Sequence, residues 1–133
     1  MTTKAPDSAS RATAVSTAKT GLGKIIVNGR GRTLYLFEKD EHRRSVCSGA
    51  CAAYWPPLIA HGRPVPTNGA KRSLIGTIKR ANGARQVTYA GHPLYTYVLD
   101  TRPGQTRGEG SQLFGAGWDA LAPSGKKIER GDD

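Results

Sequence analysis

Two cysteines carry the most reactive chemistry in this sequence. Cys47 and Cys51 are separated by three residues, a spacing that allows a small disulfide, a redox couple or part of a metal site. A redox couple needs an activated thiolate, and Arg43 and Arg44 are the nearest cations. A metal site needs further ligands, and His42 is the nearest imidazole. We favour the disulfide from the residues alone and keep the other two interpretations open.

Two aspartates form a second candidate pair. Asp40 and Asp100 each end a copy of the motif G-x-x-L-Y-x-(F/Y)-x-x-D, at residues 31–40 and again at 91–100, sixty positions later. Together they could bind a metal or perform acid–base chemistry. No second carboxylate is repeated beside them, so we favour a structural role in which each accepts backbone N–H bonds and sets the turn after its strand.

Two tryptophans follow the two motifs. Trp55 and Trp118 each precede a leucine by three positions, and they could form an exposed platform for a sugar or a quinone. A large aromatic residue in the core of a small β domain is the simpler interpretation, and we favour it.

Catalytic signatures are missing from the sequence. It has no G-x-S-x-G, no P-loop and no nucleotide fingerprint. The three histidines show no metal-ligand spacing among themselves. An enzyme hypothesis would place a site at the glycine-rich loop of residues 101–117 with Asp100 or Asp119, and only the loop composition supports it. We therefore expect a non-enzymatic protein without a cofactor.

The elements that position these residues read as β-strands. Apolar and β-branched residues 25–27 and 33–37 flank Asn28-Gly29, a dipeptide typical of a hairpin turn. Residues 74–80 and 85–89 predict a second hairpin, followed by strands at 94–99 and 118–121. No segment keeps a helical apolar period over three turns. The pattern predicts an all-β fold with at most one short helix near the cysteines.

Alternation along each motif strand separates its side chains into two faces. The aromatic residues of the motifs share one face and the leucines take the other. These aromatic residues are Tyr35, Phe37, Tyr95 and Tyr97. Half of such a repeat would leave an apolar face uncovered, so we expect the two copies to pack against each other.

The chain is therefore predicted to form a single compact domain of two pseudo-repeats, each a hairpin, a Tyr/aromatic/Asp strand and a Trp strand. We expect a flexible tether at residues 1–20, which are rich in Ala, Ser, Thr and Lys. The β domain should span 21–130, with repeats at about 21–62 and 72–128, and a tail at 131–133.

The charge of the chain indicates anionic partners. Its 20 Lys and Arg exceed its 10 Asp and Glu and give a net charge of +10. The basic residues are scattered, so a solvated surface is the simpler interpretation. No stretch has the roughly 20 apolar residues that a membrane span needs.

Several of these segments together resemble a known family. The resemblance rests on residues 35–40, 45–52, 55–58, 76–80, 89–95 and the second motif copy. They resemble the bacterial secreted lipoproteins named for a repeated Y-x-(F/W/Y)-x-x-D motif, a family of unknown function. The resemblance implies export, with lipid anchoring of the full-length precursor. Export in turn favours a disulfide between Cys47 and Cys51 and makes nucleic acid a poor partner.

We therefore expect a secreted or cell-envelope protein of unknown specific role. The preferred hypothesis is a binding module whose basic surface contacts an anionic envelope polymer, lipid headgroups or another envelope protein. The alternative is a redox or copper-type metal-handling protein that uses Cys47 and Cys51 with His42.

Overall fold

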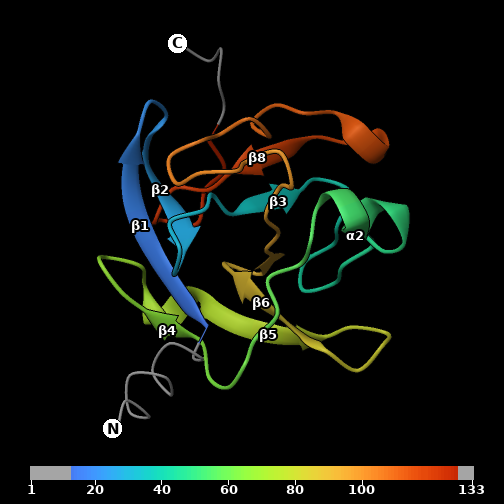
Figure 1. Cartoon of the computed structure of the whole chain (residues 1–133). Helices are drawn as coiled ribbons and strands as arrows, with labels where there is room; N and C mark the ends of the chain where they lie inside the picture. The colour runs from blue at the N-terminus through green and yellow to red at the C-terminus, as the bar shows by residue number, and fades with distance from the viewer. Residues whose placement is uncertain (1–12, 129–133) are drawn as a thin grey trace, which may run out of the picture.

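The computed structural model describes residues 13–128, which form mostly β-strands in three small sheets. Figure 1 shows these elements in chain order. The strands and helices are β1 (Ala14–Thr20), β2 (Gly23–Asn28), β3 (Tyr35–Phe37), α2 (Ala50–Tyr54), β4 (Val65–Pro66), η1 (Arg72–Leu74), β5 (Ile75–Lys79), β6 (Arg85–Tyr89), β7 (His92–Pro93), η2 (Leu113–Gly115) and β8 (Trp118–Ala120). The predicted all-β fold class is confirmed, and the short helix α2 lies at the cysteines.

The first strand corrects the expected tether. β1 pairs antiparallel with β2 from Val15 to Thr20 and parallel with the short β4 at Ala14 and Val15. A strand needs few apolar residues when its neighbours satisfy its backbone N–H and C=O groups, and the single large apolar residue of β1, Val15, is fully buried. The prediction of a tether is wrong for residues 13–20, and its remaining part, 1–12, lies outside the described residues.

The predicted turn at Asn28 is confirmed. The Asn28 side-chain oxygen accepts bonds from the backbone N–H groups of Arg30 and Arg32, each at 2.9 Å. An antiparallel bridge between Val27 and Thr33 follows. The Asn28 side chain thus caps the turn, after which the chain enters β3.

The two repeats meet at their motif tyrosines. The backbone N–H of Tyr35 donates to the carbonyl of Tyr95 at 2.8 Å, and the N–H of Tyr95 donates back at 3.0 Å. On its other edge β3 pairs with β8, the Trp118 strand of the second repeat. Tyr95 pairs correspondingly with Pro57, close after Trp55 of the first repeat. Each motif strand therefore lies between the other motif and the tryptophan segment of the other repeat.

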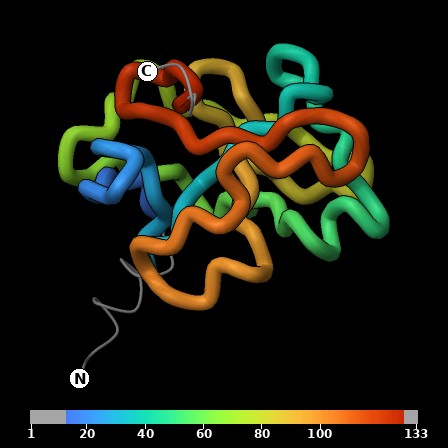
Figure 2. The backbone as a smooth tube through the Cα atoms, turned by 90° about the horizontal axis from the view of Figure 1, so that it is seen from above, coloured from blue at the N-terminus to red at the C-terminus, as the bar shows by residue number. Residues whose placement is uncertain are grey.

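The remaining strands extend this arrangement. β5 and β6 form the second predicted hairpin in full register, and β7 continues from it. The expected strand at 94–99 is wrong as a continuous element: regular pairing ends at β7 and a bridge at Tyr95, and Val98 and Leu99 are exposed. Figure 2 shows from above that the red segment with β8 crosses the molecule beside the orange loop that precedes it.

The core has two clusters, one on each face of the motif strands. The aromatic cluster holds Tyr35, Phe37, Tyr95, Tyr97, both tryptophans and both cysteines. The aliphatic cluster holds Leu34, Leu36 and Leu94 with residues of β1, β2 and β6. The predicted division of side chains between the two faces is confirmed.

Candidate functional site

The motif tyrosines and aspartates bond to each other across the two repeats. The hydroxyl of Tyr35 donates to Oδ2 of Asp100 at 2.5 Å, and the hydroxyl of Tyr95 donates to Oδ2 of Asp40 at 2.6 Å. We call these two contacts the exchanged Tyr–Asp pairs. Sequence reasoning placed each aspartate at the turn of its own strand and missed its partner in the other repeat.

The second oxygen of each carboxylate binds the loop after its own motif. Oδ1 of Asp40 accepts the N–H of Val46 at 2.7 Å, and Oδ1 of Asp100 accepts the N–H of Arg107 at 2.9 Å. Both carboxylates thus hold a loop with one oxygen and a tyrosine with the other. Every oxygen of the two carboxylates therefore accepts a hydrogen bond from the protein.

Burial controls the protonation of the exchanged pairs. Burial and the neighbouring carboxylate raise the pKa of Tyr35 and of Tyr95 well above the usual range of a phenol. Burial also raises the pKa of Asp40 and of Asp100, while the tyrosine bond opposes that rise. Both phenols therefore remain protonated donors at neutral pH.

Four aromatic rings form a continuous stack on the same face. We call Phe37, Trp118, Trp55 and Tyr97, in that order, the aromatic column; successive ring centroids are 4.0, 3.9 and 3.9 Å apart. The rings are within 15° of parallel. The column alternates between the repeats, and both tryptophans are fully buried. This stack could not be read from the sequence, because its adjacent members lie far apart along the chain.

The two motif tyrosines contact the aromatic column from its sides. Tyr35 meets Trp55 edge-on at 5.4 Å, and Tyr95 meets Trp118 edge-on at 5.2 Å. Edge-to-face contacts of this kind add to the stability that burial alone provides. The two tyrosines thus join the exchanged Tyr–Asp pairs to the column.

Cys47 and Cys51 form a disulfide, as predicted. Cys47 is fully buried and Cys51 is 7% exposed. The proposed metal set is not assembled, because both sulfurs are bonded to each other and the His42 ring lies against Gly91. Among residues 13–128 no three or more His, Cys, Asp or Glu side chains gather where they could hold a metal.

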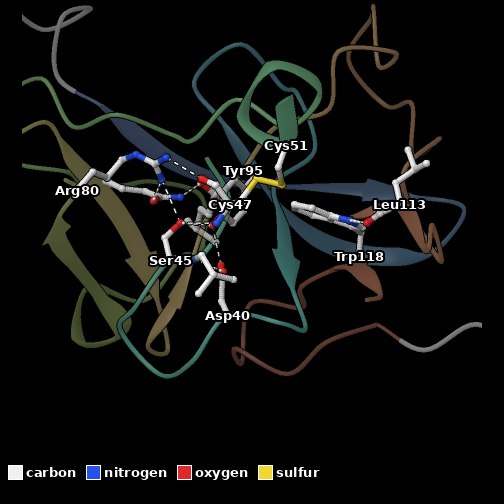
Figure 3. Close-up of a disulfide and its surroundings, with 11 residues drawn as sticks. Asp40, Ser45, Cys47, Cys51, Arg80, Tyr95, Leu113 and Trp118 are labelled. Carbon is white, nitrogen blue, oxygen red and sulfur yellow. Dashed lines mark hydrogen bonds between the residues drawn. A yellow bond between two sulfur atoms is a disulfide. The ribbon is translucent and has the colours of Figure 1, made fainter. Parts of the chain in front are cut away.

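A basic cleft lies beside the disulfide. Its volume is about 290 Å³, and Arg43, Arg44, Lys79 and Arg80 line it together with Ser45, Ser48 and Cys47. Arg80 donates to Oγ of Ser45 at 3.1 Å and to the Cys47 carbonyl at 2.7 Å. Figure 3 shows Arg80 directed toward these groups. This cleft could not be predicted from the sequence, because Arg43-Arg44 and Lys79-Arg80 lie in different repeats.

Two further cavities occupy equivalent places in the repeats. The larger, about 700 Å³, is lined by Leu36, Phe37, Glu38, Asp40 and His92 together with residues 125–127. The smaller, about 210 Å³, is lined by the residues sixty positions away, Thr96, Tyr97, Val98, Asp100 and Arg32, together with Asn28 and Arg30. Phe37 and Tyr97, the ends of the aromatic column, each face one of these cavities.

A carboxyl pair lies beside the larger cavity. Burial and the adjacent carboxylate of Glu38 raise the pKa of Asp119 to about 8, with Glu109 contributing in the same direction. Bonds from Asp119 and Lys127 lower the pKa of Glu38, and Nζ of Lys127 lies 2.8 Å from Oε2 of Glu38. Asp119 therefore keeps its proton at neutral pH, while Glu38 is ionised.

The fold and the exchanged pairs define a β protein built from two interlocked copies of one repeat. The chain matches the family described as a secreted repeat of unknown function in two segments, residues 16–59 and 76–122. These segments cover most of the chain, so the protein belongs to that family. No curated protein and no solved structure matches the chain.

The family places the protein outside the cytoplasm. Its members are secreted repeats, which agrees with the expected secreted or envelope location. No helix of residues 13–128 is long and apolar enough to cross a membrane. Lipid anchoring of the precursor stays a prediction.

Proposed function

We propose that this protein is a non-enzymatic binding module of the cell envelope whose basic cleft holds the oxyanion groups of an anionic polymer. The observation that carries the proposal is the convergence of Arg43, Arg44, Lys79 and Arg80 on one cleft. A concave site lined by positively charged side chains concentrates anions more strongly than the same charges scattered over a surface.

Arg80 supplies the oriented part of the cleft. It donates to Ser45, to Oε1 of Gln86 and to the Cys47 carbonyl. These bonds use three of the five N–H donors of its guanidinium and fix its plane. The remaining donors suit a phosphate or carboxylate, because a preorganised fork loses little entropy when it binds.

The other cations of the cleft are available to a ligand. Arg43 and Lys79 are exposed. Arg44 lies 3.6 Å from Glu41, and both side chains are largely exposed. Such a surface pair contributes little stability, so an incoming oxyanion can replace Glu41 at little cost.

A titration with charge-matched variants tests this proposal. Inorganic polyphosphate is titrated into wild type and into Arg43→Gln/Arg44→Gln/Lys79→Gln by calorimetry. The control Lys19→Gln/Lys24→Gln/Arg30→Gln removes equal charge from exposed positions of β1, β2 and the turn after β2. We expect a loss of affinity of tenfold or more for the cleft variant, since charge-assisted hydrogen bonds contribute about 1.5–3 kcal/mol each. Equal losses in both variants, or no binding by wild type, would overturn the proposal.

Lipid vesicles distinguish the two sources of phosphate groups that this cleft could bind, a polymer and a membrane surface. Binding to phosphatidylglycerol vesicles that matches polyphosphate binding would assign the cleft to lipid headgroups. Binding to polyphosphate alone supports the polymer. Phosphatidylcholine vesicles serve as the neutral control.

A redox role of the disulfide is the second candidate. Cys47 lines the basic cleft, and neighbouring cations would stabilise the thiolate formed on reduction. The test is equilibration in glutathione buffers with alkylation of free thiols. A midpoint near that of glutaredoxins, about −200 to −230 mV, would support this role, and one below about −300 mV would indicate a structural crosslink.

A further inference from the structure

The aromatic column joins two cavities through the core. Phe37 faces the larger cavity and Tyr97 the smaller one, and Trp118 and Trp55 stack between them. Indole and phenol rings are among the most easily oxidised side chains in a protein. Rings in face-to-face contact over the whole column overlap well enough to pass an electron from one to the next.

Each tryptophan of the column is next to a phenol with its own proton acceptor. Tyr35 touches Trp55, and Tyr95 touches Trp118. Their hydroxyls donate to Asp100 and Asp40 at 2.5 and 2.6 Å. A phenol that loses an electron becomes strongly acidic, and a carboxylate already bonded to it can take the proton without any movement of the backbone.

We propose that the aromatic column and the exchanged Tyr–Asp pairs form a one-electron relay between the two cavities. An outer-sphere one-electron oxidant, such as an oxidised high-potential metal complex, binds at either cavity and accepts an electron from Trp118 through the Phe37 ring or from Trp55 through the Tyr97 ring. The resulting indole radical cation takes an electron from Tyr35 or Tyr95, whose proton passes to Asp100 or Asp40. A one-electron reductant then returns the electron, and the carboxylic acid returns the proton to the tyrosyl oxygen.

Charge and burial support this sequence of steps. Burial raises the pKa of both tyrosines, so each stays a phenol that donates to its aspartate. Because the oxidised phenol is strongly acidic, its proton moves to that carboxylate when the electron leaves. Burial also raises the pKa of both aspartates, which makes them better acceptors.

Flash photolysis tests the relay. A photogenerated ruthenium tris-bipyridine oxidant is applied to Tyr54→Phe/Tyr97→Phe, which lacks the exposed phenol and the phenol of the column, and to the same protein with Tyr35→Phe, Tyr95→Phe or both added. Tyrosyl radical is followed by absorption and electron paramagnetic resonance. We expect a long-lived tyrosyl signal in this background, about half of it when either substitution is added, and its loss when both are added. Tyr89→Phe is the matched control, because Tyr89 is buried and hydrogen-bonded but lies outside the aromatic cluster.

Substituting the two aspartates should change the kinetics of tyrosyl formation, which a purely structural role of these residues would leave unchanged. In Asp40→Asn/Asp100→Asn made in the same background, whose fold is checked by circular dichroism, tyrosyl formation should slow and lose its solvent deuterium isotope effect. An unchanged rate and isotope effect would overturn the proton transfer. A radical that persists when Tyr35→Phe and Tyr95→Phe are both added to this background, or that disappears when Tyr89→Phe is added, would overturn the relay.

Discussion

At the scale of single residues, the exchanged Tyr–Asp pairs explain why the motif repeats a tyrosine and an aspartate together. Within one motif these two residues do not bond to each other; Tyr35 binds Asp100 and Tyr95 binds Asp40. Each motif therefore provides half of two contacts, and both copies are needed to complete either one.

Removing one hydroxyl should leave a buried carboxylate short of a donor. In Tyr35→Phe, Oδ2 of Asp100 loses its bond from the phenol, and the N–H of Gly108 loses its acceptor. We expect a loss of about 1–3 kcal/mol in the free energy of unfolding, measured in urea. Tyr54→Phe is the control because Tyr54 is half exposed, and it should stay within about 0.5 kcal/mol. Equal effects of both changes would contradict the importance of the pair.

The carboxyl pair should make stability depend on pH. The pKa of Asp119 is about 8 in the folded protein and about 3.9 in an unfolded chain. Between these values the folded state holds a proton that the unfolded state has lost. The contribution of Asp119 to stability therefore falls as the pH rises from about 4 to about 8.

The substitution Asp119→Asn isolates this contribution. Its amide cannot ionise, so the variant should lack the fall, and its stability relative to wild type should be greater at pH 8 than at pH 5. Urea unfolding of both proteins at the two pH values measures the difference. Parallel stability curves would show that Asp119 does not hold the extra proton.

At the scale of elements, the loop before β8 packs against the aromatic column through a glycine. A Cβ at Gly108 would lie 2.7 Å from Trp55 and 2.9 Å from the Tyr35 ring. Gly108→Ala must therefore displace large buried rings, and we expect a loss of about 1–3 kcal/mol. Gly21→Ala is the control, since a Cβ there meets nothing within 4 Å. Thermal unfolding compares the two, and an unaffected Gly108→Ala would contradict the tight packing of this loop.

The disulfide anchors the segment that enters α2. It closes a loop of five residues between Cys47 and Cys51, so the chain-entropy estimate for its contribution is about 2 kcal/mol. We expect Cys47→Ala/Cys51→Ala to lose about this much in urea unfolding. A far larger loss would mean that the disulfide supports the column directly rather than a local loop.

The sequence predicted the individual elements better than the pairing between strands. The Asn28-Gly29 turn, the β5–β6 hairpin and the aromatic and leucine faces all follow from local patterns of two to seven residues. β1 was missed because its stability comes from pairing with β2 and β4, which the composition of the strand does not reveal. Short-range patterns cannot show a strand whose partners supply most of its contacts.

At the scale of the whole molecule, the two repeats are interlocked rather than stacked. β3 pairs with β8 of the other repeat, and Tyr95 pairs with Pro57. The repeats were evident from the motif, but the exchange between them and the order of the aromatic column were not. The basic cleft was equally hidden, because Arg43 and Arg44 reach Lys79 and Arg80 only after the repeats have folded together.

The central functional claim is that this cleft binds polyanions, and the salt dependence of binding tests it most directly. Each cation that contacts a flexible polyanion contributes roughly −0.7 to the slope of log K against log salt, so the four cleft cations should give a slope of about −3. Polyphosphate affinity is measured over a series of salt concentrations for wild type and for Lys79→Gln, with Lys24→Gln as the control. We expect the slope to become shallower by about 0.7 for Lys79→Gln and to stay unchanged for Lys24→Gln. A slope near zero in wild type, or equal changes in both variants, would contradict the account.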